Sequence, residues 1–174
     1  MPAPLVRDYP ESAVVIAGGT SGVGLASAFR FADAGVRRLA LLARDKERGE
    51  AARQAVTTRC PDAQVVFVAA DAGDAGQVRA GIAEAHRALG AVDVLVSSVT
   101  ATYRPELLHR TEMTDIAGIL LGQALPPMHL TRAVLPIMTE QGGGTIVNIA
   151  SPRWPLPARA SSAPPWPRSS CSPG

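Results

Sequence analysis

Short apolar runs alternate with segments of helical periodicity along the first 151 residues of this chain. Apolar runs typical of buried strands lie at 13–18, 38–43, 64–70 and 92–98, and a fifth follows the glycine turn that opens 142–151. Helical patterns lie between them, at 23–34, 46–58, 77–89 and 114–140. Runs that are apolar throughout must be buried on both faces, which favours a parallel sheet covered by helices. With right-handed crossovers, the pattern predicts an α/β fold, a doubly wound Rossmann-type sheet of about five strands in the order 3-2-1-4-5.

The longest helical pattern contains two adjacent prolines. Pro126 and Pro127 lie in the middle of the 114–140 segment. A proline inside a helix removes one hydrogen bond and costs about 3 kcal/mol or more. We therefore expect two helical pieces in this region.

The composition of the chain changes abruptly after Ser151. Seven of the 15 prolines and both tryptophans, Trp154 and Trp166, fall within 152–174. This segment has no amphipathic period and is expected to be disordered or loosely draped. The sequence therefore predicts one domain at 1–151 and a Pro/Ser/Arg-rich tail at 152–174.

Composition and charge exclude several classes of function. The net charge is +2 and the tail carries Arg153, Arg159 and Arg168, so the remaining chain has no basic field for nucleic acid. No apolar run is long enough to span a membrane, and the first ten residues do not resemble a signal peptide. Cys60 and Cys171 are isolated, and the three histidines lack metal-ligand spacing. We expect a cytoplasmic protein with no metal, nucleic-acid or membrane partner.

A glycine-rich segment, AGGTSGVGLA, follows the first predicted strand and opens the first predicted helix. A helix N-terminus offers free N–H groups to a phosphate, and Gly18, Gly22 and Gly24 would let the backbone approach it closely. The spacing differs from G-x-G-x-x-G. It also fails as a P-loop, because Leu25 stands where a lysine is needed, and as a nucleophile elbow, because Val23 stands where a glycine is needed. A glycine-rich turn without a ligand is the alternative.

Several motifs in order resemble the classical short-chain dehydrogenase/reductase family. These are Ala17-Gly18-x3-Gly22-x-Gly24, Asp71 after the third strand, the DVLV run at 93–96, the LTRAVLP segment and methionine at 130–138, and the strand at 144–151 that ends in Ser151. The resemblance covers residues 12–151 and implies that 1–151 is an NAD(P)-binding domain. The cofactor contacts that it implies are Gly18, Gly19, Ser21, Gly22, Val23, Gly24, Arg44, Asp71, Ala72 and Ser98.

Arg44, directly after the second predicted strand, bears on the choice of cofactor. In dinucleotide folds an acid at this place binds the ribose 2′-hydroxyl of NAD, whereas an arginine accommodates the 2′-phosphate of NADP. The resemblance therefore implies NADP, with NAD as the alternative because Asp45 comes next. A solvated surface charge is the other interpretation of Arg44.

The chain departs from the family where the chemistry takes place. Ser151 matches the catalytic serine, and Gln123 stands where the family has a catalytic asparagine. The catalytic tyrosine and lysine would fall at Pro164 and Arg168, which cannot supply the proton. Thr100 replaces the glycine that ends the family's Asn-Asn-Ala-Gly turn.

These departures imply an oxidoreductase for a small-molecule carbonyl/alcohol pair that is impaired or inactive as written. The alternative is a non-catalytic nucleotide-binding or interaction module. The part of the family fold after Ser151 is missing, as in a truncated or frameshifted chain. A homo-oligomer would therefore have an incomplete interface.

Overall fold

A five-stranded parallel sheet forms the centre of the protein, in the order β3-β2-β1-β4-β5. The computed structural model describes residues 9–99 and 110–150. The strands are β1 (Ala13–Ala17), β2 (Arg38–Ala43), β3 (Gln64–Ala69), β4 (Val94–Ser97) and β5 (Thr145–Asn148). All of the pairings are parallel. The predicted fold class, strand order and approximate strand positions are confirmed.

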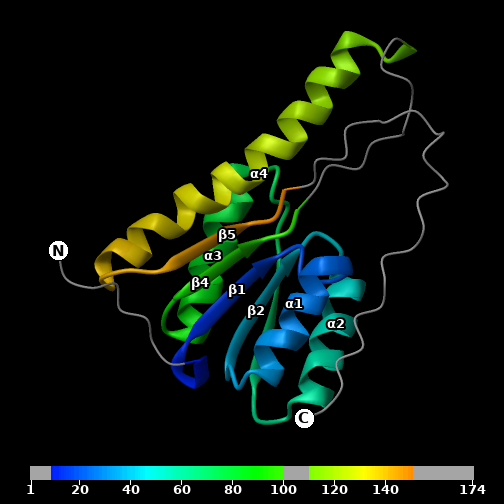
Figure 1. Ribbon diagram of the computed structural model, residues 1–174. Helices are drawn as coiled ribbons and strands as arrows, with labels where there is room; N and C mark the ends of the chain where they lie inside the picture. Colours follow the sequence, from blue (N-terminus) through cyan, green and yellow to red (C-terminus); the bar gives the residue numbers. More distant parts are fainter. Residues whose placement is uncertain (1–8, 100–109, 151–174) are drawn as a thin grey trace, which may run out of the picture.

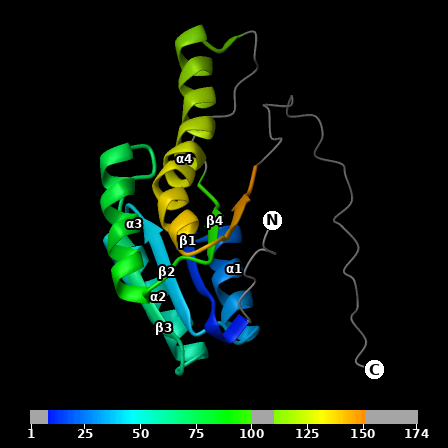
Figure 2. The same ribbon diagram turned by 90° about the vertical axis from the view of Figure 1, so that its left-hand side faces the viewer.

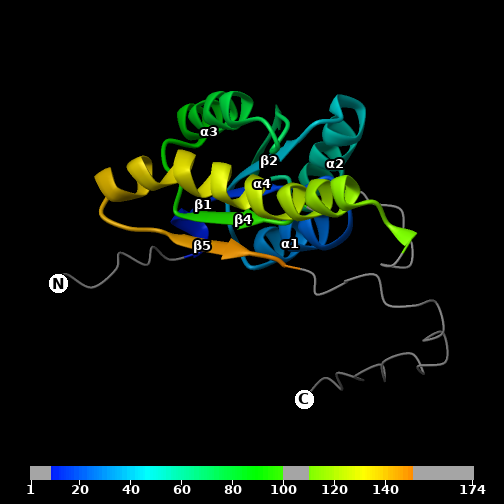
Figure 3. The same cartoon turned by 90° about the horizontal axis from the view of Figure 1, so that it is seen from above.

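Helices cover both faces of the sheet, as runs of buried apolar residues require. They are α1 (Gly22–Asp33), α2 (Lys46–Arg59), α3 (Ala75–Leu89) and α4 (Met113–Glu140), and a short 3-10 helix precedes β1 (Tyr9–Glu11). One core cluster joins α3 and α4 to the sheet, and a second joins α1 and α2 to its opposite face. Figure 2 shows α3 and α4 on one side of the sheet and α1 on the other. Seen from above, α4 lies between α3 and β5 (Figure 3).

The carboxyl ends of the strands meet at one edge of the sheet (Figure 1). The register places Ala17 opposite Leu42 on one side and opposite Ser97 on the other. Ser97 is in turn opposite Asn148. From β1 the chain continues to β2 on one side, whereas β4 lies on the other side of β1. The strand order therefore changes direction at β1. Ligands bind at such a switch point in open α/β sheets.

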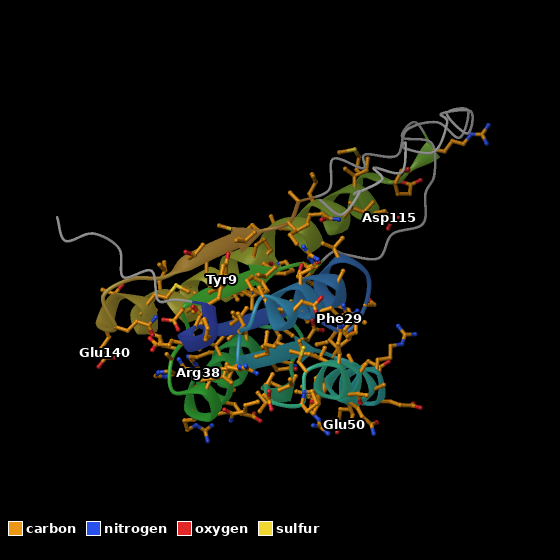
Figure 4. The ribbon with its side chains drawn as sticks, turned by 60° about the horizontal axis from the view of Figure 1, so that its bottom comes forward. Tyr9, Phe29, Arg38, Glu50, Asp115 and Glu140 are labelled. Atoms are coloured by element: carbon orange, nitrogen blue, oxygen red, sulfur yellow. The ribbon has the colours of Figure 1, made fainter. Side chains whose placement is uncertain are left out.

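Helix α4 is continuous, so the expectation of two helical pieces was wrong. It spans Met113–Glu140 with Pro126, Pro127 and Pro136 inside it. Its buried residues are Pro126 at the middle of the helix and Leu130, Val134 and Met138 in the second half. The first half extends past the sheet (Figure 1), and Asp115 and Glu140 in Figure 4 lie near the two ends of the whole helix. Proline has no N–H, so each proline leaves the carbonyl group one turn earlier without a donor, and in the exposed first half water can bond that carbonyl. Packing of the second half against the sheet offsets the remaining cost of the prolines.

Two sequence expectations lie outside the described residues. These are the place of Thr100 in the family's turn and the form of the tail at 152–174. Within 9–99 and 110–150, no helix has the length and apolar character that a membrane span requires.

Candidate functional site

Two glycines in the turn between β1 and α1, Gly18 and Gly24, have no room for a side chain. Gly18 has a φ of +77°, and its N–H donates to the carbonyl of Leu42 at 2.8 Å. A β-carbon on Gly18 would lie 2.5 Å from the carbonyl oxygen of Ser98, and one on Gly24 would overlap the carbonyl of Gly18. The turn is therefore packed tightly against the end of β4.

Gly22 differs from its neighbours because its missing side chain would face open space. Its φ is +52°, which favours glycine, and no heavy atom lies within 4 Å of a β-carbon built there. Packing inside the protein does not explain this glycine. A ligand that approaches the backbone at the start of α1 would use the space.

The N-terminus of α1 lacks the caps that the next two helices carry. Asp45 accepts a hydrogen bond from the N–H of Arg48 at the start of α2, and Asp74 accepts two at the start of α3. Ser21 at the start of α1 makes no such bond, and no acidic residue lies in the first turn. Since the first N–H groups of a helix have no partner within it, this end suits an anion.

Arg44 and Asp71 lie next to each other beyond the ends of β2 and β3. The guanidinium of Arg44 is 3.8 Å from the carboxylate of Asp71, and both side chains are exposed. The other Asp71 oxygen accepts the N–H of Gly73 at 2.9 Å. Asp45 caps α2, so its carboxylate is occupied by the end of a helix. Within the part of the chain that the structure describes, Arg44 caps no helix and makes only the exposed contact with Asp71 given above.

The segment after β3 is fixed by a network of polar contacts that the sequence did not reveal. Gln77 accepts the N–H of Asp71 at 3.1 Å through its side chain and donates to Asp74 at 3.2 Å. Hydrogen bonds from the backbone of Gln77 and Gly76 lower the pKa of the Asp74 carboxyl below its usual value. The Asp71–Ala72 pair is thus part of an ordered loop.

At the end of β4, Ser98 contributes its backbone to the site. Its N–H donates to the carbonyl of Ala17 at 2.9 Å, and its own carbonyl contacts Gly18. Ser97 beside it is buried, with 2% of its surface exposed. Ser98 therefore lies beside the glycine turn.

The two predicted catalytic residues are not brought together within the described structure. Gln123 lies half-buried on α4, in the half that extends past the sheet. Ser151 lies outside the described residues, directly after Ala150. The backbone leading to it is anchored, since the N–H of Ile149 donates to the carbonyl of Ser97 at 2.8 Å.

Two further features lie away from the glycine turn. An apolar groove runs along the outer side of α4, lined by Pro127, Met128, Thr131, Arg132, Leu135, Pro136, Thr139, Glu140 and Asn148. Among residues 9–99 and 110–150, no group of three or more histidine, cysteine or acidic side chains is arranged to hold a metal ion.

The sheet, the glycine turn at its switch point and the open helix end define a nucleotide-binding protein of the Rossmann type. Residues 12–158 match the short chain dehydrogenase family. The chain therefore belongs to the short-chain dehydrogenase/reductase family, as its motifs implied.

Individual relatives are about one third identical to this chain over the matched residues. Levodione reductase from Leifsonia aquatica is 31% identical over 151 residues, which are 82% of this chain and 53% of the relative. The 2-(R)-hydroxypropyl-CoM dehydrogenase of Xanthobacter autotrophicus is 38% identical over 147 residues, 79% of this chain and 55% of the relative. This chain spans little more than half the length of these relatives.

Solved structures give the same result. An NADPH-bound short chain oxidoreductase from Pseudomonas aeruginosa PAO1, described as containing an atypical catalytic center, has a TM-score of 0.76 and 32% identity. The match covers 83% of this chain and 56% of that one. L-Sorbose reductase from Gluconobacter frateurii, complexed with NADPH and L-sorbose, has a TM-score of 0.73 and 28% identity, covering 86% of this chain and 57% of that one.

Proposed function

We propose that this chain binds NADP(H) at the turn between β1 and α1, as the cofactor-binding half of an oxidoreductase. The observation that supports this most strongly is the contrast among the glycines. Gly18 and Gly24 are required by contacts within the protein, whereas Gly22 leaves open space beside an uncapped helix end. A pyrophosphate needs both a close backbone approach and free N–H groups.

Each part of the dinucleotide would meet a different element of the chain. The first turn of α1, from Ser21 to Gly24, would hold the pyrophosphate, with Gly19 below it. Arg44 would pair with the 2′-phosphate, because its guanidinium is exposed and the neighbouring Asp45 is engaged as a helix cap. Asp71 and Ala72 would line the adenosine, and Ser98 would lie beside the turn.

The preference for NADP over NAD agrees with the solved relatives. Two structures similar to this chain are described as containing NADPH. One of them also has, by its description, an atypical catalytic center. A departure from the family's catalytic residues is therefore compatible with cofactor binding in a protein of this fold.

The proposed substrate is a small molecule with a carbonyl or alcohol group. Relatives of this chain include a levodione reductase, a sulfoacetaldehyde reductase and a 2-(R)-hydroxypropyl-CoM dehydrogenase. A bound nicotinamide would supply or accept the hydride. Ser151 would orient the substrate oxygen and Gln123 would supply an amide, by resemblance to the family.

We further propose that turnover by the chain as written is impaired. A carbonyl that accepts hydride needs a proton at its oxygen, and such help is typically worth about 10²- to 10⁴-fold. Pro164 and Arg168 stand where the family has its tyrosine and lysine. A nucleotide-binding protein without turnover is the second candidate, and these two residues favour it.

Two measurements on the full chain test these proposals. Saturable enhancement of NADPH fluorescence would support cofactor binding, and its absence at concentrations that saturate an active relative would refute it. NADPH oxidation with a panel of aldehydes and ketones then separates the two candidates. Turnover close to that of the relative supports an active oxidoreductase, whereas binding without turnover supports the second candidate.

A further inference from the structure

His129 on α4 contacts the loop that follows β3, far from it in the sequence. Its Nδ1 lies 3.1 Å from the carbonyl oxygen of Ala72, 57 residues away. Because a carbonyl only accepts, Nδ1 carries the hydrogen and donates it. The ring is half-buried, and Ala72 is 4% exposed. The bond therefore joins α4 to the loop in a partly dry environment, where an unmade bond is costly.

The other hydrogen bonds of this loop are made within the stretch from Asp71 to Gln77. Asp71 accepts the N–H of Gly73 at 2.9 Å through its side chain and the N–H of Asp74 at 3.0 Å through its carbonyl. Gln77 bonds the backbone of Asp71 and the side chain of Asp74. These bonds give the loop its shape and tie it to the first turn of α3, but none of them reaches α4.

Contacts that anchor the loop to other elements are few among the described residues. The N–H of Ala70 donates to the carbonyl of Ala43 at 3.0 Å, immediately before the loop begins. Within the loop, the Arg44–Asp71 ion pair is exposed and longer than a hydrogen bond, so it contributes little. The bond from His129 joins the loop to α4.

We propose that His129 is a positioning residue that fixes the Asp71–Asp74 loop on α4 and thereby sets the affinity for the adenosine part of the cofactor. This inference rests on the proposed function, because Asp71 and Ala72 are the proposed adenosine contacts. The same helix carries Gln123. His129 therefore connects the adenosine side of the site to the helix on which the family places a catalytic amide.

Replacing the imidazole separates its hydrogen bond from its bulk. His129→Leu keeps an apolar side chain on α4 but has no donor, whereas the amide of His129→Asn can donate to the Ala72 carbonyl. Val134→Ala is the control, since Val134 is fully buried on the same helix and its truncation weakens packing without removing a hydrogen bond to the loop.

Titration with NADPH, followed by its fluorescence, measures the effect on binding. We expect His129→Leu to weaken binding roughly 5-fold, the equivalent of one ordinary hydrogen bond. His129→Asn and Val134→Ala should bind within about 2-fold of wild type. Equal affinity of His129→Leu and wild type would overturn the proposal, as would equal losses in His129→Leu and either other variant.

Amide hydrogen exchange tests the same role without any cofactor. The proposal predicts faster exchange at Gly73 and Asp74 in His129→Leu, protection restored in His129→Asn, and wild-type rates in Val134→Ala. Unchanged exchange at these amides would overturn the role of His129 even where NADPH binds. A wild-type chain that does not bind NADPH would refute the proposed function, while the exchange rates would still decide whether His129 positions the loop.

Discussion

The guanidinium of Arg44 lies 3.8 Å from the carboxylate of Asp71, across the ends of the neighbouring strands β2 and β3. Their side chains are 71% and 41% exposed, so the pair contributes little to folding and a stronger anion can displace the carboxylate. Asp45 is occupied by the first turn of α2. Cofactor choice at this edge is therefore expected to depend on Arg44.

Replacing Arg44 should change the preference between cofactors. Arg44→Ala is expected to weaken NADPH by roughly 10- to 100-fold, because a hydrogen bond to a charged group is lost, and to leave NADH almost unchanged. Dissociation constants for both cofactors check this. Arg53→Ala removes the same charge from the same side of the sheet, where Arg53 pairs with Glu50, and should affect neither cofactor. If Arg44→Ala weakens both cofactors equally, Arg44 is only a surface charge.

Turnover is expected to be low even where NADPH binds. Without a general acid the rate should fall about 10²- to 10⁴-fold below that of an active family member. NADPH oxidation by the purified 174-residue chain, with Ser151→Ala beside it, measures this. Robust oxidation that Ser151→Ala abolishes would contradict the prediction.

The cap of α3 should make stability depend on pH in acid. The pKa of the Asp74 carboxyl is lowered by hydrogen bonds from Gln77 and Gly76, so its charged form stabilises the fold. This contribution is complete above the unfolded pKa, about 3.9, and is lost as the pH falls through the lower folded value. Urea unfolding should show Asp74→Ala to be less stable than wild type at pH 7.

The difference between these two proteins should shrink as the pH falls below about 4, since first the unfolded chain and then, below the lowered folded pKa, the folded protein binds a proton at this carboxyl. Asp62→Ala is the control, because Asp62 forms an exposed ion pair with Arg37 and caps no helix. A constant difference between wild type and Asp74→Ala from pH 7 into acid would show that this charge does not stabilise the cap.

Two glycines in helices should respond to alanine in opposite directions. A β-carbon on Gly24 would overlap the carbonyl of Gly18, so Gly24→Ala should destabilise the protein by about 1–3 kcal/mol. Gly118 on α4 has open space around it, and Gly118→Ala should stabilise by up to about 1 kcal/mol. Thermal unfolding of both variants checks this. Equal stability of Gly24→Ala and wild type would mean that the turn is looser than the structure indicates.

Much of this fold could be predicted from local sequence, because its elements are bounded by clear signals. The strands are short runs of buried aliphatic residues, and Gly35 and Gly90 both adopt positive φ where a helical pattern stops. The length of α4 could not be predicted in this way. Proline has a known local cost, but whether Leu130, Val134 and Met138 offset it depends on packing against the sheet.

The long-range contacts at the site could not be predicted from local sequence either, because they depend on how distant segments pack together. Asp45 directly precedes a helical pattern, where aspartate is a preferred cap, but the sequence does not show that Arg44 faces Asp71. His129 looked like an ordinary helix residue, because its partner Ala72 contributes only a backbone carbonyl. Such contacts leave no residue-type pattern.

The central claim is that the open space beside Gly22 receives the pyrophosphate of NADP(H). Fluorescence titration of NADPH into wild type, Gly22→Val and Gly35→Val tests it most directly. Gly35 is a matched control, since it also has a positive φ, +94°, and its β-carbon would meet only Pro10 at 3.9 Å. Both positions have a positive φ that valine rarely adopts, but only the valine at Gly22 would fill the proposed phosphate site. We predict that Gly22→Val abolishes NADPH binding while Gly35→Val retains it; equal affinities in all three proteins would contradict the claim.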